Sequence, residues 1–421
     1  MAKVKDLLEF INKSPTPYQV VENSAARLKK AGFKELELSE AWKLKRGGRY
    51  YVKIFGTALV AFALGKKRGR LRISAAHTDF PCFRLKPKAG IVKGGCGILN
   101  VEPYGGLILR SWLDRPLGIA GKVALAGKNP FSPKTKLVDF ARPLVTIPSL
   151  AIHMDREVND KGKLNPQQDM LPIATIGTED MTAEFFLEFL AKELGEKPEN
   201  ILSYDLSLYP TEGGRLLGLD NEFISSPRLD NLTSVLASIA GIIAAKPEKG
   251  LSLAALFDNE EVGSRTKQGA ASAVLPEILR RIYDGIGDSG LAEDIAGGFM
   301  LSADVAHAAH PSHLDKSDPT NEVHLGAGVV LKQAASQSYA GDVEAVAVIR
   351  ALARAKKIPH QTFVNRSDSR GGSTLGSIAS ALLGIRTMDI GVPILAMHSA
   401  QEMMAASDQN AIEKLVTEFL Q

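Results

Sequence analysis

The stretch LSLAALFDNEEVGS at residues 251–264 decides the fold expected for this chain. Residues 251–257 form an uninterrupted apolar run of strand length, which is typical of a strand buried on both faces of a parallel sheet. Asp258, Glu260 and Glu261 follow at once. Functional side chains of open α/β sheets lie just beyond the carboxyl ends of the strands, so the two glutamates are candidate site residues. An isolated Glu-Glu pair is more often a solvated turn, and the rest of the chain must decide between the two interpretations.

The composition is that of an ordinary globular protein. With 421 residues the chain exceeds the ~250–300 residues at which one core stops growing, which favours two domains. The net charge of +4 is spread over 51 basic and 47 acidic side chains without a large basic block, so no nucleic-acid partner is expected. Cys82 and Cys96 form neither a disulfide framework nor a zinc-type pair, which indicates reduced thiols. No secretion signal or membrane span is recognised, and we expect a cytoplasmic protein without a membrane partner.

The texture of the sequence changes twice along the chain. From about residue 84 to 219 glycines and prolines are frequent and β-branched runs such as 107–112 are short, with one clear helix at 182–194. After residue 219 helical and strand patterns alternate, which indicates a parallel sheet. We therefore expect an α/β catalytic domain with a mixed, mostly parallel sheet flanked by helices, formed by residues 1–83 and 220–421. A β-rich second domain at 84–219 interrupts it.

Potential metal ligands follow several of the expected strands. His77 comes at the end of one strand with Asp79 two residues later, Asp304 comes after another, and His398 comes after the last. Asp230 lies at the start of an expected helix. Imidazole and carboxylate ligands without thiolates suit zinc, manganese or cobalt, and an excess of carboxylates suits a two-metal centre.

The chemistry of such a centre needs these residue types. One carboxylate has to bridge two cations ~3.5–4 Å apart, and another has to take a proton from water. Asp79 can accept the second ring N–H of His77 and fix its tautomer. A lone histidine at a strand end is more often structural, and an aspartate at a helix start is usually a cap. Their joint occurrence at successive strand ends favours the metal centre.

At this point the sequence resembles a known family. The motifs that carry the resemblance are HTD at 77–79, SPRLDNL at 226–232, FDNEEVGS at 257–264, SADVAHAAHP at 302–311 and AMHSAQEM at 396–403. They resemble the M18 metallopeptidases, the aspartyl aminopeptidase family, in order and over essentially the whole chain. The resemblance implies a catalytic α/β domain interrupted by a β-rich lid or dimerisation domain. It also implies a large homo-oligomer, often a tetrahedral dodecamer built from dimers.

The resemblance further implies a role for each residue of the centre. The implied ligands of two divalent ions, zinc with manganese or cobalt as alternatives, are Asp230 as the bridge, Glu261 and His398 at one ion, and His77 and Asp304 at the other. Glu260 would be the general base, and Asp79 would orient His77. The implied activity is removal of the N-terminal residue of peptide substrates, with a preference for Asp or Glu.

Further residues are assigned to substrate binding or to catalysis, and most of them have an ordinary structural alternative. In relatives a histidine at the place of His153 reaches a neighbouring subunit and stabilises the oxyanion, although alone it would be a polar residue on a strand. Lys332 stands where aspartyl aminopeptidases bind the acidic side chain, and a solvated lysine at a strand edge is the alternative. Gly372 and Ser373 open a helix and could present N–H groups to substrate. A phosphate loop is the alternative, but the lysine pattern of such loops is missing. Family members often have Pro-Cys before the glycine of this loop, whereas this chain has Arg370-Gly371, and the cation at Arg370 would favour acidic substrates.

Three alternatives to an acidic-residue aminopeptidase remain open. A neutral-residue, leucyl-type aminopeptidase would keep the chemistry and change the specificity. Another two-metal amide hydrolase, such as a deacylase or carboxypeptidase, would act on substrates with a blocked N-terminus. A non-enzymatic assembly scaffold would have no reason to keep Glu260 beside Glu261. The histidines His307, His310 and His313 have no implied ligand role and are interpreted as structural or rim residues.

Overall fold

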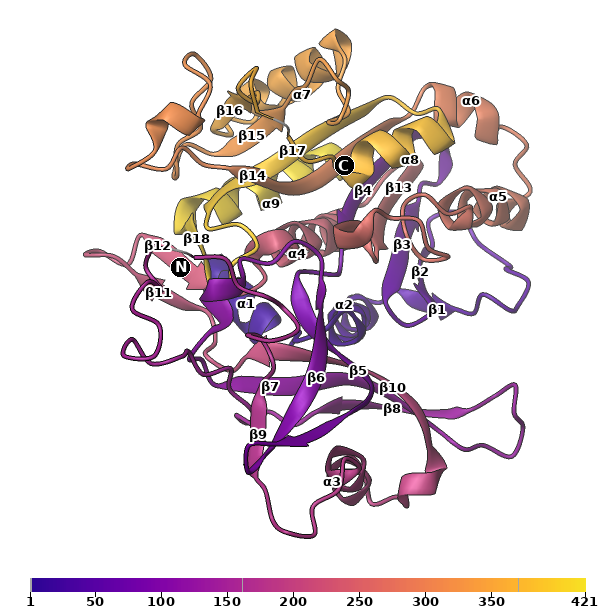
Figure 1. Cartoon of the computed structure of the whole chain (residues 1–421). Helices are drawn as coiled ribbons and strands as arrows, with labels where there is room; N and C mark the ends of the chain where they lie inside the picture. The colour runs from indigo at the N-terminus through magenta and orange to yellow at the C-terminus, as the bar shows by residue number, and fades with distance from the viewer. Residues whose placement is uncertain (1, 161, 370) are drawn as a thin grey trace. The chain divides into compact units, whose positions relative to one another are not determined.

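The computed structural model describes residues 2–160, 162–369 and 371–421, and the chain folds into two compact units (Figure 1). The first unit comprises the described residues of Met1–Phe80, Gly214–Met397 and Glu402–Gln421. The second comprises those of Pro81–Gly213 together with His398–Gln401. The sequence places the corresponding boundaries at residues 84 and 219, and a lid or dimerisation role for the second unit stays a prediction.

A sheet of twelve strands forms the centre of the first unit. Its order is β1-β2-β3-β13-β4-β14-β17-β18-β12-β11, while β15 pairs with β17 and β16 pairs with β15. The strands are β1 (Lys34–Leu36), β2 (Arg49–Ile54), β3 (Ala58–Leu64), β4 (Lys67–His77), β11 (Arg215–Leu217), β12 (Phe223–Ser226), β13 (Lys249–Phe257), β14 (Phe299–His307), β15 (Val329–Lys332), β16 (His360–Phe363), β17 (Thr387–Leu395) and β18 (Glu402–Ala405).

The central strands are parallel and buried on both faces. β13, β4, β14 and β17 are neighbours with parallel pairing, and antiparallel pairs occur on either side of them. Along β13, Ala254 and Leu256 belong to the core on one face of the sheet, whereas Leu253 and Ala255 belong to the core on the other. The period of two explains why the sequence of this strand is a continuous apolar run. The expected mixed, mostly parallel sheet flanked by helices is confirmed.

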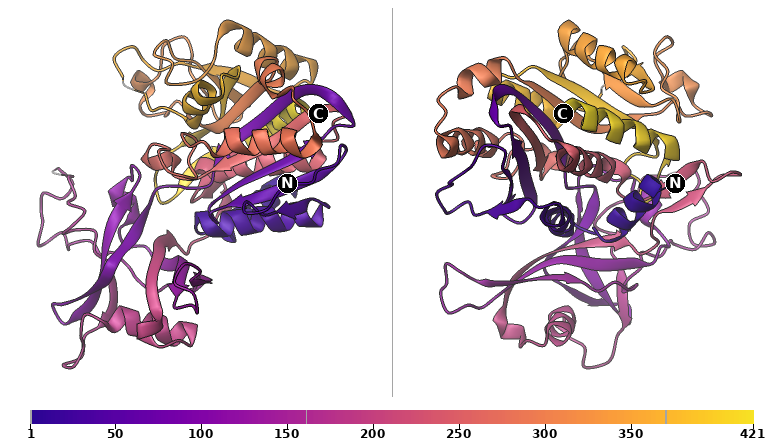
Figure 2. Two further views of the ribbon diagram at one scale, coloured as in Figure 1. Left: turned by 90° about the vertical axis from the view of Figure 1, so that its right-hand side faces the viewer. Right: turned by 180° about the vertical axis from the view of Figure 1, so that it is seen from behind.

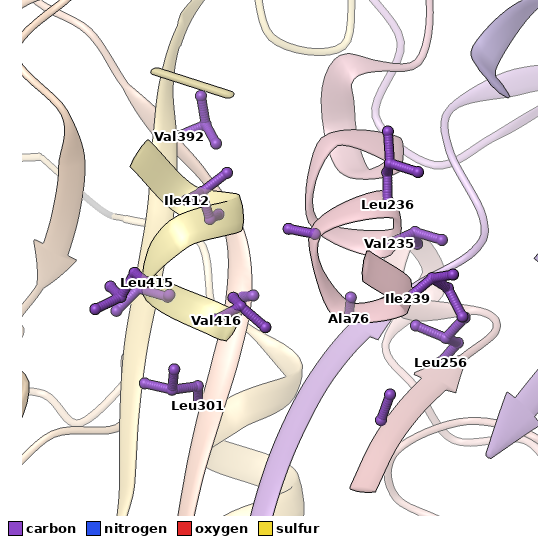
Figure 3. Close-up of a cluster of buried hydrophobic side chains, with 14 of the residues drawn as sticks. Ala76, Val235, Leu236, Ile239, Leu256, Leu301, Val392, Ile412, Leu415 and Val416 are labelled. Carbon is purple, nitrogen blue, oxygen red and sulfur yellow. The ribbon is translucent and has the colours of Figure 1, made fainter. Parts of the chain in front are cut away.

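Helices cover both faces of this sheet. The core on one face includes residues of α1 (Ala2–Asn12), α2 (Pro17–Lys30), α4 (Leu229–Ala244), α7 (Val343–Ala355) and α9 (Ala406–Leu420). The core on the other face includes residues of α5 (Val274–Ile286) and α8 (Leu375–Leu383), and α6 (Leu291–Ala296) packs residues against it. Figure 3 shows α4 and α9 side by side, with Val235, Ile239, Ile412 and Val416 among the buried side chains. Each such side chain stabilises the fold by roughly 1.5–3 kcal/mol through burial.

Two local expectations differ from the structure. β14 continues to His307, so Asp304 lies within the strand, although the sequence places it after the strand. Pairing with β17 continues past Asp304 to His307, which lies opposite Ile394, and this pairing extends the strand. Within the run 107–112, Leu109–Trp112 forms a 3₁₀ turn.

The second unit is a six-stranded antiparallel sheet with the order β8-β7-β10-β5-β6-β9. Its elements are β5 (Cys82–Lys93), β6 (Cys96–Tyr104), β7 (Leu117–Leu125), β8 (Lys134–Asp139), β9 (Ile173–Ile176), β10 (Ile201–Pro210) and the helix α3 (Phe185–Leu194). α3 lies beside this sheet in all views and buries Phe186 and Leu190 in its core (Figures 1 and 2). The expected β-rich character of this region is confirmed. Among the helices of the described ranges, none is long and apolar enough to cross a membrane.

Candidate metal centre

The centre of the site is His77, the last residue of β4. Its Cα pairs with that of Phe257, the last residue of β13, so two neighbouring parallel strands end at the same level. The ring atom Nδ1 lies 3.0 Å from the carbonyl oxygen of Asp79. A carbonyl oxygen only accepts, so Nδ1 carries the proton. This contact fixes the orientation of the ring and leaves Nε2 to face the other residues of the site.

Two carboxylates from other elements approach Nε2 of His77. Asp230 Oδ1 and Asp304 Oδ1 each lie 3.4 Å from this nitrogen. Asp304 comes from β14, the strand next to β4, and Asp230 from the first turn of α4. The backbone of α4 departs from helical dihedral angles at Asp230, and the Asp230–Asn231 peptide bond is cis. All three side chains are largely buried.

The acidic pair that follows β13 is held by Asp79. Asn259 has a left-handed backbone (φ 62°), which turns the chain sharply into the 3₁₀ turn Glu260–Val262. The N–H groups of Glu260 and Glu261 then donate to the two carboxylate oxygens of Asp79, each over 3.1 Å. Asp79 is fully buried, and these two hydrogen bonds fix the position of the turn. The sequence predicts Asp79 as a partner of His77. It does not predict the two hydrogen bonds that Asp79 accepts from the turn.

The crowding of negative charge raises the proton affinity of the site. Burial, followed by the charges of Asp304, Asp79 and Asp230, raises the pKa of Glu260 to about 8, although His77 acts in the opposite direction. Burial alone would lower the pKa of His77, but Asp230, Asp304 and Asp79 together raise it well above its ordinary value. Strongly shifted groups of this kind cluster at functional sites, because a carboxylate with a pKa near neutrality can exchange protons during a reaction.

These residues fit divalent metal ions. Single ligand atoms of His77, Glu260 and Glu261 lie within 4.8 Å of one another, and so do those of His77, Asp230 and Asp304. The donors are an imidazole nitrogen and carboxylate oxygens, the set that zinc, manganese and cobalt accept. A cation at this place would also offset the repulsion that raises the pKa of Glu260.

Two predicted site residues belong to the second unit. His398 lies in the connection between β17 and β18, and its Nδ1 is 2.9 Å from the carbonyl oxygen of Gly106. This contact fixes the Nδ1–H tautomer, which leaves Nε2 as the atom able to bind a metal. His153 is exposed in a turn, not on a strand. The ligand role of His398 and the catalytic role of His153 stay predictions.

The predicted substrate-binding residues lie in three different settings. Gly372 and Ser373 are exposed in the loop before α8, whereas Lys332 is buried at the end of β15. Arg370 lies outside the described residues. Gly372 lines a cavity of about 540 Å³, which His307 at the end of β14 and Phe363 at the end of β16 also line. His310 and His313 belong to the same lining, in agreement with their interpretation as rim residues.

The sequence interpretation left two supporting residues without a role. Glu402, the first residue of β18, is buried, and its Oε2 accepts from the N–H of Asp230 over 3.0 Å. Asn231 donates from Nδ2 to the carbonyl oxygen of Ala303 over 3.0 Å, which ties the start of α4 to β14. Both lie inside the quoted motifs SPRLDNL and AMHSAQEM, and an acidic residue in a mostly apolar stretch was the available signal for Glu402.

Comparisons with known proteins agree with this geometry. The family described as "Aminopeptidase I zinc metalloprotease (M18)" matches residues 10–420. The "Probable M18 family aminopeptidase 2" of Clostridium acetobutylicum is 44% identical over 425 residues, covering 99% of this chain and 98% of that protein. The crystal structure of prApe1 is similar with a TM-score of 0.93 and 30% identity, covering 99% and 93% of the two chains. The structure of the S. cerevisiae mApe1 dodecamer has a TM-score of 0.86 and 28% identity, covering 99% and 95%.

The family model, the relatives and the solved structures therefore each match nearly the entire chain. The match is not confined to the catalytic motifs, because it extends through the second unit. The family is one of zinc-dependent peptide hydrolases, and the donors gathered around His77 are of the kind that zinc accepts. The chain belongs to the M18 family of metallo-aminopeptidases.

Proposed function

We propose that this protein removes the N-terminal residue of peptides at a centre that holds two zinc ions. Asp230 would bridge the ions, with Glu261 and His398 at one and His77 and Asp304 at the other. The observation that supports this most strongly is the approach of two carboxylates to within 3.4 Å of one imidazole nitrogen, beside Glu260. Manganese or cobalt would suit the same donors.

Glu260 handles the proton in this proposal. It takes a proton from the attacking water, whose oxygen adds to the first peptide carbonyl, and it then delivers that proton to the leaving amine as the C–N bond breaks. Asp79 keeps Glu260 in place by accepting its backbone N–H. The ions supply Lewis acidity when bound, since they lower the pKa of water and polarise the scissile carbonyl. His153 would stabilise the oxyanion in a neighbouring subunit.

The restriction to the N-terminus follows from the charge of the site. A free α-amine is a cation at neutral pH, and the described centre is rich in carboxylates that attract it. An acetylated N-terminus has no such charge. For the side chain of the first residue we propose a preference for Asp or Glu, which the presence of Arg370 in the sequence, an additional cation, supports.

A second candidate, a neutral-residue aminopeptidase, is favoured by the charges of the cavity. Arg366 and Lys316 both line it, but Arg366 forms a bidentate pair with Asp368 and Lys316 lies 3.3 Å from Asp315. Phe363 adds an apolar wall. Cations that are already paired attract an acidic side chain less strongly, so this lining would also accept a leucyl-type side chain.

Hydrolysis of a matched peptide series tests both candidates. The series begins with Asp, Glu, Leu or Lys, each with a free and with an acetylated N-terminus, and turnover is measured after chelation and after adding zinc, manganese or cobalt. We expect metal-dependent release of free Asp or Glu only. Release of Leu instead would favour the second candidate, and turnover of the acetylated peptides would contradict an aminopeptidase.

The assembly and location complete the proposal. We infer a homo-oligomer, in its fullest form a tetrahedral dodecamer, which the similarity to the mApe1 dodecamer supports. Light scattering should then give a mass near twelve times 45.2 kDa. In a cytoplasmic setting Cys82 and Cys96, both free, would stay reduced. A monomer with full activity would contradict a catalytic role for His153 across subunits.

A further inference from the structure

Lys332 is the most unusual charged side chain beside the centre. It is the last residue of β15 and only 4% exposed. Among the described residues it is the one buried lysine. Burying an unpaired ammonium destabilises a fold, so the groups that pair with Lys332 indicate its role.

Both hydrogen-bond acceptors of this ammonium belong to β14. Nζ donates to Asp304 Oδ2 over 2.9 Å and to the carbonyl oxygen of Val305 over 2.8 Å. The ring of Tyr339 lies 4.8 Å from Nζ and adds a cation–π contact. Burial alone would lower the pKa of Lys332, but Asp304 raises it above its ordinary value, so the group stays charged. The ammonium is therefore committed to Asp304 and its neighbour.

The two oxygens of Asp304 face different partners. Oδ2 accepts from Lys332, and Oδ1 lies 3.4 Å from Nε2 of His77. A carboxylate on a single bond can rotate, and a charge-assisted hydrogen bond to one oxygen limits that rotation. The Oδ1 atom is thus kept on the side of His77, in the position required of a ligand.

The sheet leaves room for this contact. β17 runs between β14 and β15, and its Gly391 pairs with Asp304 on one side and Val330 on the other. A Cβ atom at this glycine would lie 2.8 Å from the carbonyl oxygen of Val305, the atom that accepts from Lys332. Any side chain at position 391 would compete with the ammonium for this space.

We propose that Lys332 is a positioning residue that holds Asp304 for metal binding. This role rests on the proposed function, in which Asp304 is a ligand. It differs from the role of a reader of the substrate's acidic side chain, because two of the three ammonium N–H groups already donate to Asp304 and Val305. The partners that orient metal ligands typically change metal affinity about 10–100-fold when they are mutated.

The test compares zinc affinity, measured by chelator competition, in the full-length protein and its variants. Lys332→Met removes the charge and keeps most of the stem, Lys332→Arg keeps the cation, and Lys356→Met makes the same change at an exposed lysine paired with Glu418. We expect the zinc affinity of Lys332→Met to fall about 10–100-fold, with partial recovery in Lys332→Arg and no change in Lys356→Met. A zinc affinity of folded Lys332→Met within twofold of wild type would overturn the proposal.

Two further readouts separate the possible failures. A reader role predicts that Lys332→Met raises KM for Asp peptides alone and leaves zinc affinity unchanged. If Asp304→Asn also leaves zinc affinity unchanged, the ligand assignment itself fails. If Lys332→Met does not fold, reductive methylation of the wild-type protein replaces it. Under conditions that methylate the exposed Lys316, we expect Lys332 to stay unmethylated, both with and without added aspartate. Modification that aspartate prevents would overturn the positioning role.

Discussion

At the scale of single residues, Glu260 carries the proposed chemistry. Its pKa of about 8 arises mainly from burial and from the neighbouring carboxylates, so the group holds a proton more tightly than an exposed glutamate does. Bound cations would lower this pKa again. A larger fraction of Glu260 would then be ionised, and the ionised form is the one that accepts a proton. The residue is therefore poised to exchange protons near neutral pH.

Exchange of this carboxylate for an amide should separate binding from chemistry. We predict that Glu260→Gln keeps its metal and its fold while kcat falls about 10²–10⁴-fold, the usual contribution of a general base. Glu344→Gln, at an exposed position of α7, is the control. Steady-state kinetics together with elemental analysis give the answer. Wild-type turnover in a metal-loaded Glu260→Gln protein would exclude the base role.

The sequence predicts residue identities better than residue contacts. Strand ends predict His77, Asp304 and Glu260, because side chains at the carboxyl ends of parallel strands converge, and a helix start predicts Asp230. The substrate role of Lys332 stays a prediction, and no pattern in β15 reveals that its ammonium donates to Asp304 on another strand. Contacts across a sheet depend on register, which a single sequence does not give.

At the scale of elements, the turn after β13 depends on one carboxylate. Asp79 accepts hydrogen bonds from two consecutive N–H groups through its two carboxylate oxygens. An amide side chain cannot accept both, because its oxygen accepts but its nitrogen donates. We predict that Asp79→Asn lowers kcat/KM or metal affinity about 10–100-fold. Kinetics and chelator competition measure the two effects separately. Values within twofold of wild type would show that the turn does not need this anchor.

The contact of α8 with the sheet requires a glycine. A Cβ atom at Gly376 would lie 2.5 Å from Asp389 Oδ1 and 2.6 Å from Ser302 Cβ, so the helix would have to move. We predict that Gly376→Ala lowers the free energy of unfolding by about 1–3 kcal/mol, despite the better helix propensity of alanine. Gly297→Ala, where the nearest atom lies at 3.4 Å, is the control. Equal melting temperatures of the two variants would contradict this packing.

The start of α9 should make stability depend on pH. Asp408 accepts from the N–H groups of Gly326 and Gly328, and burial raises its pKa to about 6. The folded carboxyl thus binds its proton more tightly than the unfolded one, so its stabilising contribution is present below about pH 4 and is lost as pH rises through about 6.

Denaturation of Asp408→Asn at several pH values measures this effect. The wild type should lose roughly 1–3 kcal/mol of unfolding free energy relative to the variant between pH 4 and pH 7. A difference between the two proteins that stays constant over this range would contradict the raised pKa of Asp408.

Element types followed from the sequence more reliably than element ends. The apolar run 251–257 was recognised because both of its faces are buried, and the helix α4 because its apolar residues recur at helical spacing. The sequence does not predict the continuation of β14 past Asp304, since pairing with β17 extends this strand beyond its apolar run. Pairing partners, which are distant in sequence, set the ends of strands.

At the scale of the whole molecule, residues from four separate stretches of the first unit build one centre. The end of β4 contributes His77, the turn after β13 contributes Glu261, β14 contributes Asp304 and the start of α4 contributes Asp230. The M18 family match along the chain fits this distribution, because the site exists only when these stretches fold together. We propose that these stretches together hold the metal ions.

Elemental analysis of the wild-type protein and Asp230→Asn, loaded with zinc and dialysed in parallel, tests that claim most directly. Both proteins are first checked for equal oligomeric state and helix content. We predict two zinc ions per wild-type chain and a clear loss from Asp230→Asn, because removal of the bridging carboxylate weakens both positions. The same zinc content in both folded proteins would contradict the account.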